Sequence, residues 1–219
     1  SQNESSFNLS RRWWFAIASA SVIGGIFQGV QILRKDRESS GLEQSFEDLA
    51  GVSIEGRWQH RPDGYHSGLA ISLMGFSSAS MLGKTVRLEF TRNSGVTPVA
   101  VFFRHPSGFG SVVLDAYRRG LGGIEVVDGE TLIESLSAFP FEIEDGRRYL
   151  LEVRIEEESI LVSVDGVLKQ DLHISDKRLT IAEDWKWDEE KIGDFSLVVG
   201  VYKNSSTIHS VRVRSVESD

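Results

Sequence analysis

Residues 149–156 read YLLEVRIE, and residues 160–165 read ILVSVD with a glycine directly behind them. Apolar residues take every second position in both segments. The apolar face of the first segment consists of Tyr149, Leu151, Val153 and Ile155. Successive side chains of a strand point to opposite faces of its sheet, so this alternation predicts two half-buried strands. Asp165-Gly166 tolerates the positive φ of a tight turn and predicts a hairpin at the end of the second strand.

The same two-residue period extends over residues 54–219. Residues 86–92 and 210–216 also alternate, whereas residues 99–103, 111–114 and 195–201 are apolar at successive positions. Continuous apolar runs are typical of strands that are covered on both faces. We count about ten to twelve short strands, with turn residues between them and no convincing helix. The sequence therefore predicts an all-β fold, an antiparallel two-sheet jelly-roll sandwich.

An apolar segment precedes this domain. Residues 13–33 contain 21 residues without a formal charge, between the basic pairs Arg11-Arg12 and Arg34-Lys35. A helix of that length spans about 30 Å, the thickness of a bilayer's hydrocarbon core. We therefore expect a tail at 1–12, one transmembrane helix or signal anchor at 13–33, a linker at 34–53 and the sandwich at 54–219. A cleavable export signal and a buried or amphipathic helix are the alternatives.

Composition excludes several classes of function. The chain has 219 residues, of which 40% are hydrophobic and 26% charged, as expected for a packed core. It contains no cysteine, which excludes disulfides, cysteine-ligated zinc, iron–sulfur clusters and thiol catalysis. The net charge of −8 disfavours nucleic-acid binding. The five histidines show no metal-ligand spacing, and we expect no cofactor.

The order of several short segments carries a family resemblance. The segments are residues 56–58 (GRW), 87–95 (RLEFTRNSG), 112–117 (VVLDAY), 123–129 (GIEVVDG), 146–149 (GRRY) and 162–166 (VSVDG). In this order they resemble the concanavalin A-like (laminin-G-like) jelly-roll domains of planctomycete-type bacterial proteins, which lie beyond a single membrane helix. The resemblance implies an extracytoplasmic module that binds a sugar or another ligand, or a spacer.

Glycosidases of related folds carry the pattern E-x-D-x-E on one strand, which sets carboxylates on one face for general-acid and nucleophile roles. This chain lacks that pattern. In its densest acidic run, residues 152–158, Arg154 lies between Glu152 and Glu156, an arrangement that favours a cross-strand charge ladder. We therefore expect no enzyme activity.

Alternation also predicts one candidate ligand-binding cluster. If Val99 and its alternate neighbours point between the sheets, Arg104 faces the other way, and Asp115 and Tyr117 oppose Leu114 in the next run. These three side chains, with Glu89, are expected to gather on one sheet face. The alternative is ordinary polar decoration of a sheet.

A second candidate is the pair Trp185 and Trp187 in the acidic loop 183–190. Alternation would expose one indole ring while the other packs, and an exposed ring suits the C–H face of a sugar. The alternative is a loop packed onto the end of the sandwich.

The function predicted from these observations is a membrane-anchored, non-catalytic carbohydrate- or ligand-binding or sensory module at the bacterial cell surface. We expect a single-pass membrane protein with its C-terminal domain outside the cytoplasm and a glycan or a cell-surface protein as partner. The alternatives are a glycoside hydrolase of the same fold and a structural interaction domain that pairs through Gly25, Gly29 and the sandwich surface.

Overall fold

The computed structural model describes residues 45–118, 120–135 and 138–216. The predicted tail 1–12, the predicted membrane segment 13–33 and the first part of the linker lie outside these ranges. Within the described ranges, no helix has the length and apolar character needed to cross a bilayer.

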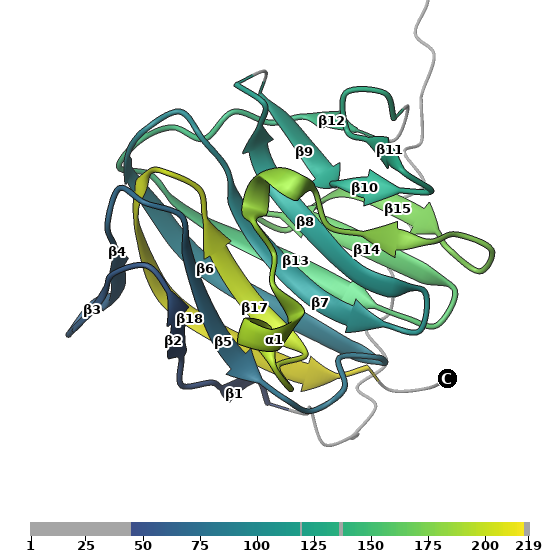
Figure 1. The fold of residues 1–219 in the computed structure, drawn as a ribbon, viewed down its shortest axis with the longest axis horizontal. Coiled ribbons are helices and arrows are strands. Elements are labelled where there is room, and N and C mark those ends of the chain that lie inside the picture. The colour runs from purple at the N-terminus through teal and green to yellow at the C-terminus, as the bar shows by residue number, and fades with distance from the viewer. Residues whose placement is uncertain (1–44, 119, 136–137, 217–219) are drawn as a thin grey trace, which may run out of the picture. The chain divides into compact units, whose positions relative to one another are not determined.

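Two sheets pack face to face (Figure 1), as the sequence predicted. The eight strands of the first, sheet A, are β1 (Glu47–Asp48), β3 (Trp58–Arg61), β4 (Gly64–Ser67), β6 (Lys84–Ser94), β13 (Arg148–Ile155), β14 (Ser159–Val164), β15 (Val167–His173) and β18 (Ser205–Ser215). The ten strands of sheet B are β2 (Val52–Glu55), β5 (Ser72–Ser77), β7 (Val99–His105), β8 (Gly108–Ala116), β9 (Leu121–Ile124), β10 (Val126–Val127), β11 (Glu130–Thr131), β12 (Phe139–Pro140), β16 (Leu179–Thr180) and β17 (Leu197–Val201).

The strand pairing is antiparallel except for β16 on β8, within the part of the chain that the structure describes. The main path of sheet A runs β15-β14-β13-β6-β18-β4-β3, and that of sheet B runs β11-β10-β16-β8-β7-β17-β5-β2. The described strands outnumber the predicted ten to twelve because several have only two residues. The expectation of no helix also needs correction, since η1 (Glu183–Trp185) and α1 (Glu189–Ile192) lie between β16 and β17.

Sheet A follows the predicted alternation. Alternate residues of β13 are buried against sheet B, and their neighbours are half-buried or exposed. The predicted hairpin joins β14 to β15, with Asp165 at φ 51° and Gly166 at φ 77°. Both residue types tolerate this left-handed backbone region, which is why the two-residue turn forms here.

Sheet B is apolar on both faces. All five residues of β17 are buried, and β7 is buried from Val99 to Phe103. Its inner face packs against sheet A, while its outer face carries a second apolar cluster that includes Phe102, Val113 and Val198. Residues 181–195, which we call the strap, cover this outer face with Trp185 and Ile192. The predicted two-sided burial is thus confirmed, and the strap provides the outer cover.

A buried ion pair joins the two sheets. Arg92, on the inward face of β6, is 4% exposed, and its Nη1 lies 2.5 Å from Oδ2 of Asp115 in β8. Asp115 has φ 61° within the irregular register between Val113 and Ala116. This bulge turns the carboxylate inward, which corrects the expectation that Asp115 faces away from Leu114. The same guanidinium reaches Asp145 Oδ1 at 2.5 Å and the carbonyl oxygen of Ile143.

We predict that Arg92→Met lowers the free energy of unfolding by about 3–5 kcal/mol, because it leaves the Asp115 carboxylate buried without a cation. The matched control is Arg87→Met, at another arginine of β6. The half-buried ion pair of Arg87 with Glu152 is expected to contribute about 1 kcal/mol or less to the free energy of unfolding. Urea denaturation measures both values. Adding Asp115→Asn to Arg92→Met should restore part of the loss, and equal effects of the two single variants would contradict this role.

Candidate functional site

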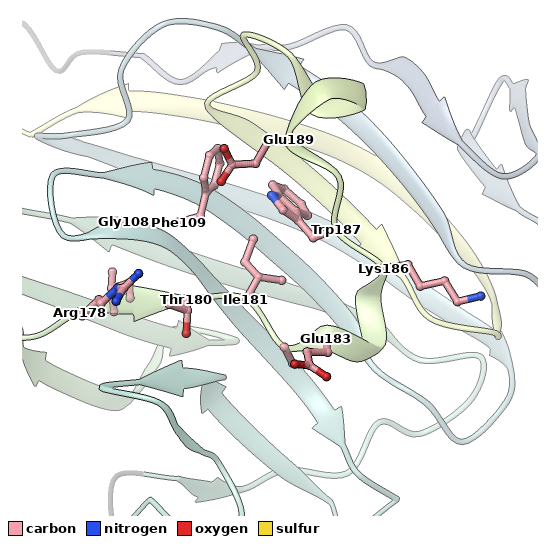
Figure 2. Close-up of a pocket in the computed structure, with 11 residues that line it drawn as sticks. Gly108, Phe109, Arg178, Thr180, Ile181, Glu183, Lys186, Trp187 and Glu189 are labelled. Atoms are coloured by element: carbon pink, nitrogen blue, oxygen red, sulfur yellow. The ribbon is translucent and has the colours of Figure 1, made fainter.

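The strap leaves two pockets on the outer face of sheet B, one near each end of β8. The Trp187 pocket, of about 500 Å³, lies over the beginning of β8. Its lining residues are Gly108, Phe109, Arg178 to Glu183, Lys186, Trp187 and Glu189. Figure 2 shows the aromatic rings of Phe109 and Trp187 on one side, and Arg178 and Thr180 entering from the region of β16. The pocket therefore combines aromatic surface with side chains that form hydrogen bonds.

Aromatic contacts hold Trp187 in place. Its ring centroid lies 4.9 Å from that of Phe102 and 5.1 Å from that of Phe109. The guanidinium carbon of Arg104 lies 4.3 Å above the centre of the Phe109 ring, a cation–π contact. The indole Nε1 of Trp187 is buried and has no hydrogen-bond partner among the described residues. A buried donor without an acceptor is costly, which makes this atom notable.

The Tyr117 pocket, of about 560 Å³, lies at the other end of β8. Its aromatic lining residues are Tyr117, Trp185 and Tyr202, and its charged ones are Arg118, Glu125, Asp184 and Lys203. The exposed side chains of Val96 and Ile133 also line it. Tyr117 and Arg118 have φ of 58° and 52°, so a left-handed turn ends β8 and carries both residues into the pocket wall.

Glu125 forms part of this pocket from the junction of β9 and β10. The residue is 4% exposed, and its carboxylate accepts hydrogen bonds from Trp185 Nε1, at 2.9 and 3.1 Å, and from Ser111 Oγ at 2.9 Å. Burial raises the pKa of Glu125 to about 7, and the nearby charge of Asp184 acts in the same direction. The two hydrogen bonds oppose that shift without cancelling it. Glu125 therefore changes its protonation near neutral pH.

Tyr117 presents a second polar group here. Burial, together with the negative charge of Glu125, raises the pKa of Tyr117 well above its usual value. Its hydroxyl thus stays protonated and remains a hydrogen-bond donor. The hydroxyl oxygen is buried and has no partner within the described ranges. Each pocket on this face consequently contains an aromatic side chain with an unused donor.

The structure brings together some of the predicted site residues and separates others. Tyr117 and Trp185 line one pocket, Trp187 lines the other, and Arg104 stacks on Phe109 beside the latter. Neither indole is fully exposed, because Trp185 is 1% exposed and Trp187 is half-buried.

The predicted cluster of Arg104, Asp115, Tyr117 and Glu89 does not form. Asp115 lies between the sheets, and Glu89 lies on the outer face of sheet A, where its carboxylate contacts Arg148 at 2.7 Å and Arg212 at 2.6 Å. Alternation shows which residues of one strand share a face, but it does not show which sheet the strand joins. That is why Glu89 was assigned to the wrong surface.

Sequence reasoning missed Glu125. Its signal is a single carboxylate within the glycine-flanked apolar run 123–127 (GIEVV), where a charged residue is unusual in a buried strand. Such a residue is expected to have buried polar partners, which here are Ser111 and Trp185. Across the described residues, no group of three His, Asp or Glu side chains is arranged to hold a metal ion.

Comparisons with known proteins identify the fold. No protein-family model matches the chain, and no curated protein matches it in sequence. Among solved structures, the carbohydrate binding module CBM66 from Bacillus subtilis is 18% identical with a TM-score of 0.56, over 77% of this chain and 98% of that one. The VIP36 exoplasmic/lumenal domain, in its Ca²⁺/Man3GlcNAc-bound form, is 11% identical with a TM-score of 0.53, over 78% and 84%. The Crh5 transglycosylase in complex with NAG is 9% identical with a TM-score of 0.55, over 81% of each chain.

At these identities the similarity concerns the fold alone. The described residues form an all-β two-sheet sandwich that matches these jelly-roll structures, which confirms the predicted architecture of the C-terminal domain. The expected relation to planctomycete-type proteins finds no support in these structures.

We predict that Glu125→Gln changes how stability depends on pH. Because folding raises the pKa of Glu125 from 4.5 to about 7, the folded state binds the extra proton between these values. The wild-type protein should therefore lose stability relative to the variant as pH rises from 4.5 to 7, by on the order of 3 kcal/mol. Urea denaturation at pH 5 and pH 8 measures this difference. Glu142→Gln, which removes an exposed carboxylate, is the control. A pH dependence of Glu125→Gln no larger than that of this control would contradict the assignment.

Proposed function

We propose that this chain is a carbohydrate-binding module that holds a sugar against the outer face of sheet B. The observation that carries the proposal is a pair of aromatic side chains, Tyr117 and Trp187, each of which lines one pocket and has a buried donor without a partner among the described residues. A sugar combines apolar C–H faces with hydroxyl oxygens that accept hydrogen bonds. An aromatic side chain with a free donor matches both parts of such a ligand.

The charges around the pockets favour a neutral ligand. Each pocket is lined by two carboxylates and two cations, Glu125 and Asp184 with Arg118 and Lys203 in the Tyr117 pocket, and Glu183 and Glu189 with Arg178 and Lys186 in the Trp187 pocket. These groups can accept hydrogen bonds from sugar hydroxyls or donate to them, and the balanced charges give no net attraction for an ionic ligand. The fold shared with a carbohydrate binding module supports the same class of ligand. We therefore infer a neutral saccharide.

We predict that Tyr117→Phe and Trp187→Phe each weaken glycan binding about three- to tenfold, because each removes one hydrogen-bond donor. Neither should destabilise the unliganded protein through lost hydrogen bonds, since neither donor has a partner in it. The control is Tyr65→Phe, whose hydroxyl accepts a bond from the Gly51 amide. That variant should lose about 1 kcal/mol of stability and keep its affinity. Isothermal titration, with a neutral oligosaccharide selected on a glycan array, measures binding.

The same experiment separates the alternatives. Absence of glycan binding together with stable self-association would contradict the proposal and favour a structural interaction domain. Release of reducing ends from the bound oligosaccharide would favour a glycoside hydrolase, a reading for which the raised pKa of Glu125 is the specific support. In that case Glu125→Gln should abolish release while leaving binding in place.

We further propose that residues 13–33 anchor the chain in a membrane, on the length and basic flanks of that segment. The two flanks carry similar numbers of Lys and Arg, so the placement of the sandwich outside the cytoplasm is proposed from the family resemblance alone. Protease added to right-side-out vesicles should then digest the sandwich domain. Protection of the domain in those vesicles, with digestion after detergent is added, would contradict the orientation. Release of the chain from the membranes by a carbonate wash would contradict the anchor.

A further inference from the structure

A further cleft, separate from the two pockets of sheet B, lies at the edge of sheet A. It has a volume of about 460 Å³, and its lining residues come from the β3–β4 hairpin and its flanks and from β6 and β18. Figure 1 shows the backbone of this hairpin at the edge of sheet A. Its lining residues are Arg57, Gln59, Arg61, His66, Ser67, Gly68, Asn93 and Ser205. Apart from the glycine, each has a polar side chain, and none is a carboxylate. This lining distinguishes the cleft from the two pockets of sheet B, each of which has two carboxylates beside its two cations.

The two arginines of the cleft lack counter-charges. Within the part of the chain that the structure describes, the exposed side chain of Arg57 forms no ion pair, and Arg61 donates only to the neutral Gln59 Oε1 at 2.8 Å.

Three arginines on the outer face of sheet A are paired with carboxylates, Arg87 with Glu152, and Arg148 and Arg212 with Glu89. Arg214 of the same sheet lies over the Phe46 ring instead. Arg57 and Arg61 differ from these residues because both line one cleft and neither has a carboxylate or an aromatic ring as its partner among the described residues. The planar fork of a guanidinium matches a carboxylate or a sulfate.

A series of hydrogen bonds holds two side chains of the cleft, Asn93 and His66, in place. Asn93 Nδ2 donates to Thr207 Oγ1 at 3.0 Å, and that hydroxyl lies 3.2 Å from His66 Nδ1. His66 Nε2 lies 2.8 Å from Asp63 Oδ1, and the bond from His66 lowers the pKa of Asp63 below its usual value. Asp63 does not line the cleft, and its contact is with His66 and not with either arginine. Asn93 and His66 are oriented before any ligand arrives.

We propose that this cleft is a second ligand site, which binds the acidic group of an anionic carbohydrate, a uronate carboxylate or a sulfate ester. Arg57 and Arg61 bind the acidic group, while Gln59, Asn93 and Ser205 bind neighbouring hydroxyl groups. The protein then recognises neutral sugar on sheet B and acidic sugar on sheet A. This site does not depend on the function proposed for the strap face, because the two share no residue.

The test uses the full chain and three probes: an oligogalacturonate, the same oligomer with its carboxylates reduced to alcohols, and a sulfated oligosaccharide. Isothermal titration should show binding of at least one acidic probe and none of the reduced oligomer at this site. Arg57→Gln and Arg61→Gln should each weaken binding about tenfold or more, as expected for a lost charge-assisted hydrogen bond. Which acidic probe binds identifies the acidic group.

Two controls make the result specific. Arg104→Gln removes an exposed arginine from sheet B and should leave acidic-glycan binding unchanged. Tyr117→Phe should also leave it unchanged, so failure of the strap-face function and failure of this one are distinguishable. Equal loss in Arg57→Gln and Arg104→Gln, binding of the reduced oligomer that Arg57→Gln weakens as much as binding of the acidic one, or binding of inorganic sulfate as tight as that of the oligosaccharides would each overturn the proposal. Melting temperatures of Arg57→Gln and Arg61→Gln within the wild-type range verify that both variants fold.

Discussion

The burial of both faces of sheet B is the constraint on which the rest of this domain depends. Strands β7, β8 and β17 carry apolar side chains on both faces of sheet B, and sheet A covers only the inner face. The other face must be covered by the chain itself, because a large exposed apolar patch is unfavourable in water. The strap does this with Trp185 and Ile192. It crosses the face without filling it, and the two pockets are the spaces that remain beside it.

The indole ring that covers this apolar face carries an N–H group, which needs a hydrogen-bond acceptor when it is buried. The buried Nε1 of Trp185 needs an acceptor, and Glu125 provides one from within the sheet. The carboxylate is itself buried, with the neutral donors Ser111 Oγ and Trp185 Nε1 as hydrogen-bond partners, and its pKa rises to about 7. Asp115 is equally buried but has the guanidinium of Arg92 at 2.5 Å. Two buried carboxylates in one domain therefore serve different purposes. One joins the sheets as an ion pair, and the other joins the strap to sheet B through neutral donors.

The two outer faces of the sandwich differ in chemistry, because the strap covers one of them and the other faces water. The outer face of sheet B is apolar with a pocket of mixed charge at each end of β8, whereas the outer face of sheet A carries ion pairs such as Arg87–Glu152 and Arg148–Glu89. Among the described residues, Arg57 and Arg61 have no carboxylate partner at the edge near β3. The two proposals therefore assign a neutral sugar to one face and an acidic sugar to the other.

The sequence by itself determined the features that depend on neighbouring residues. The period of two in residues 149–156, the continuous apolar runs and the Asp165-Gly166 turn predicted the strands, the two-sided burial of sheet B and one hairpin, because each expresses a local backbone preference. Only the tertiary structure decided which side chains meet. The bulge at Asp115 turned its carboxylate toward Arg92, strand β6 took Glu89 to sheet A, and the strap carried Trp185 onto Glu125. Alternation reports the two faces of one strand, whereas a site is built from strands far apart in the chain, whose pairing is set by the packing of the whole domain.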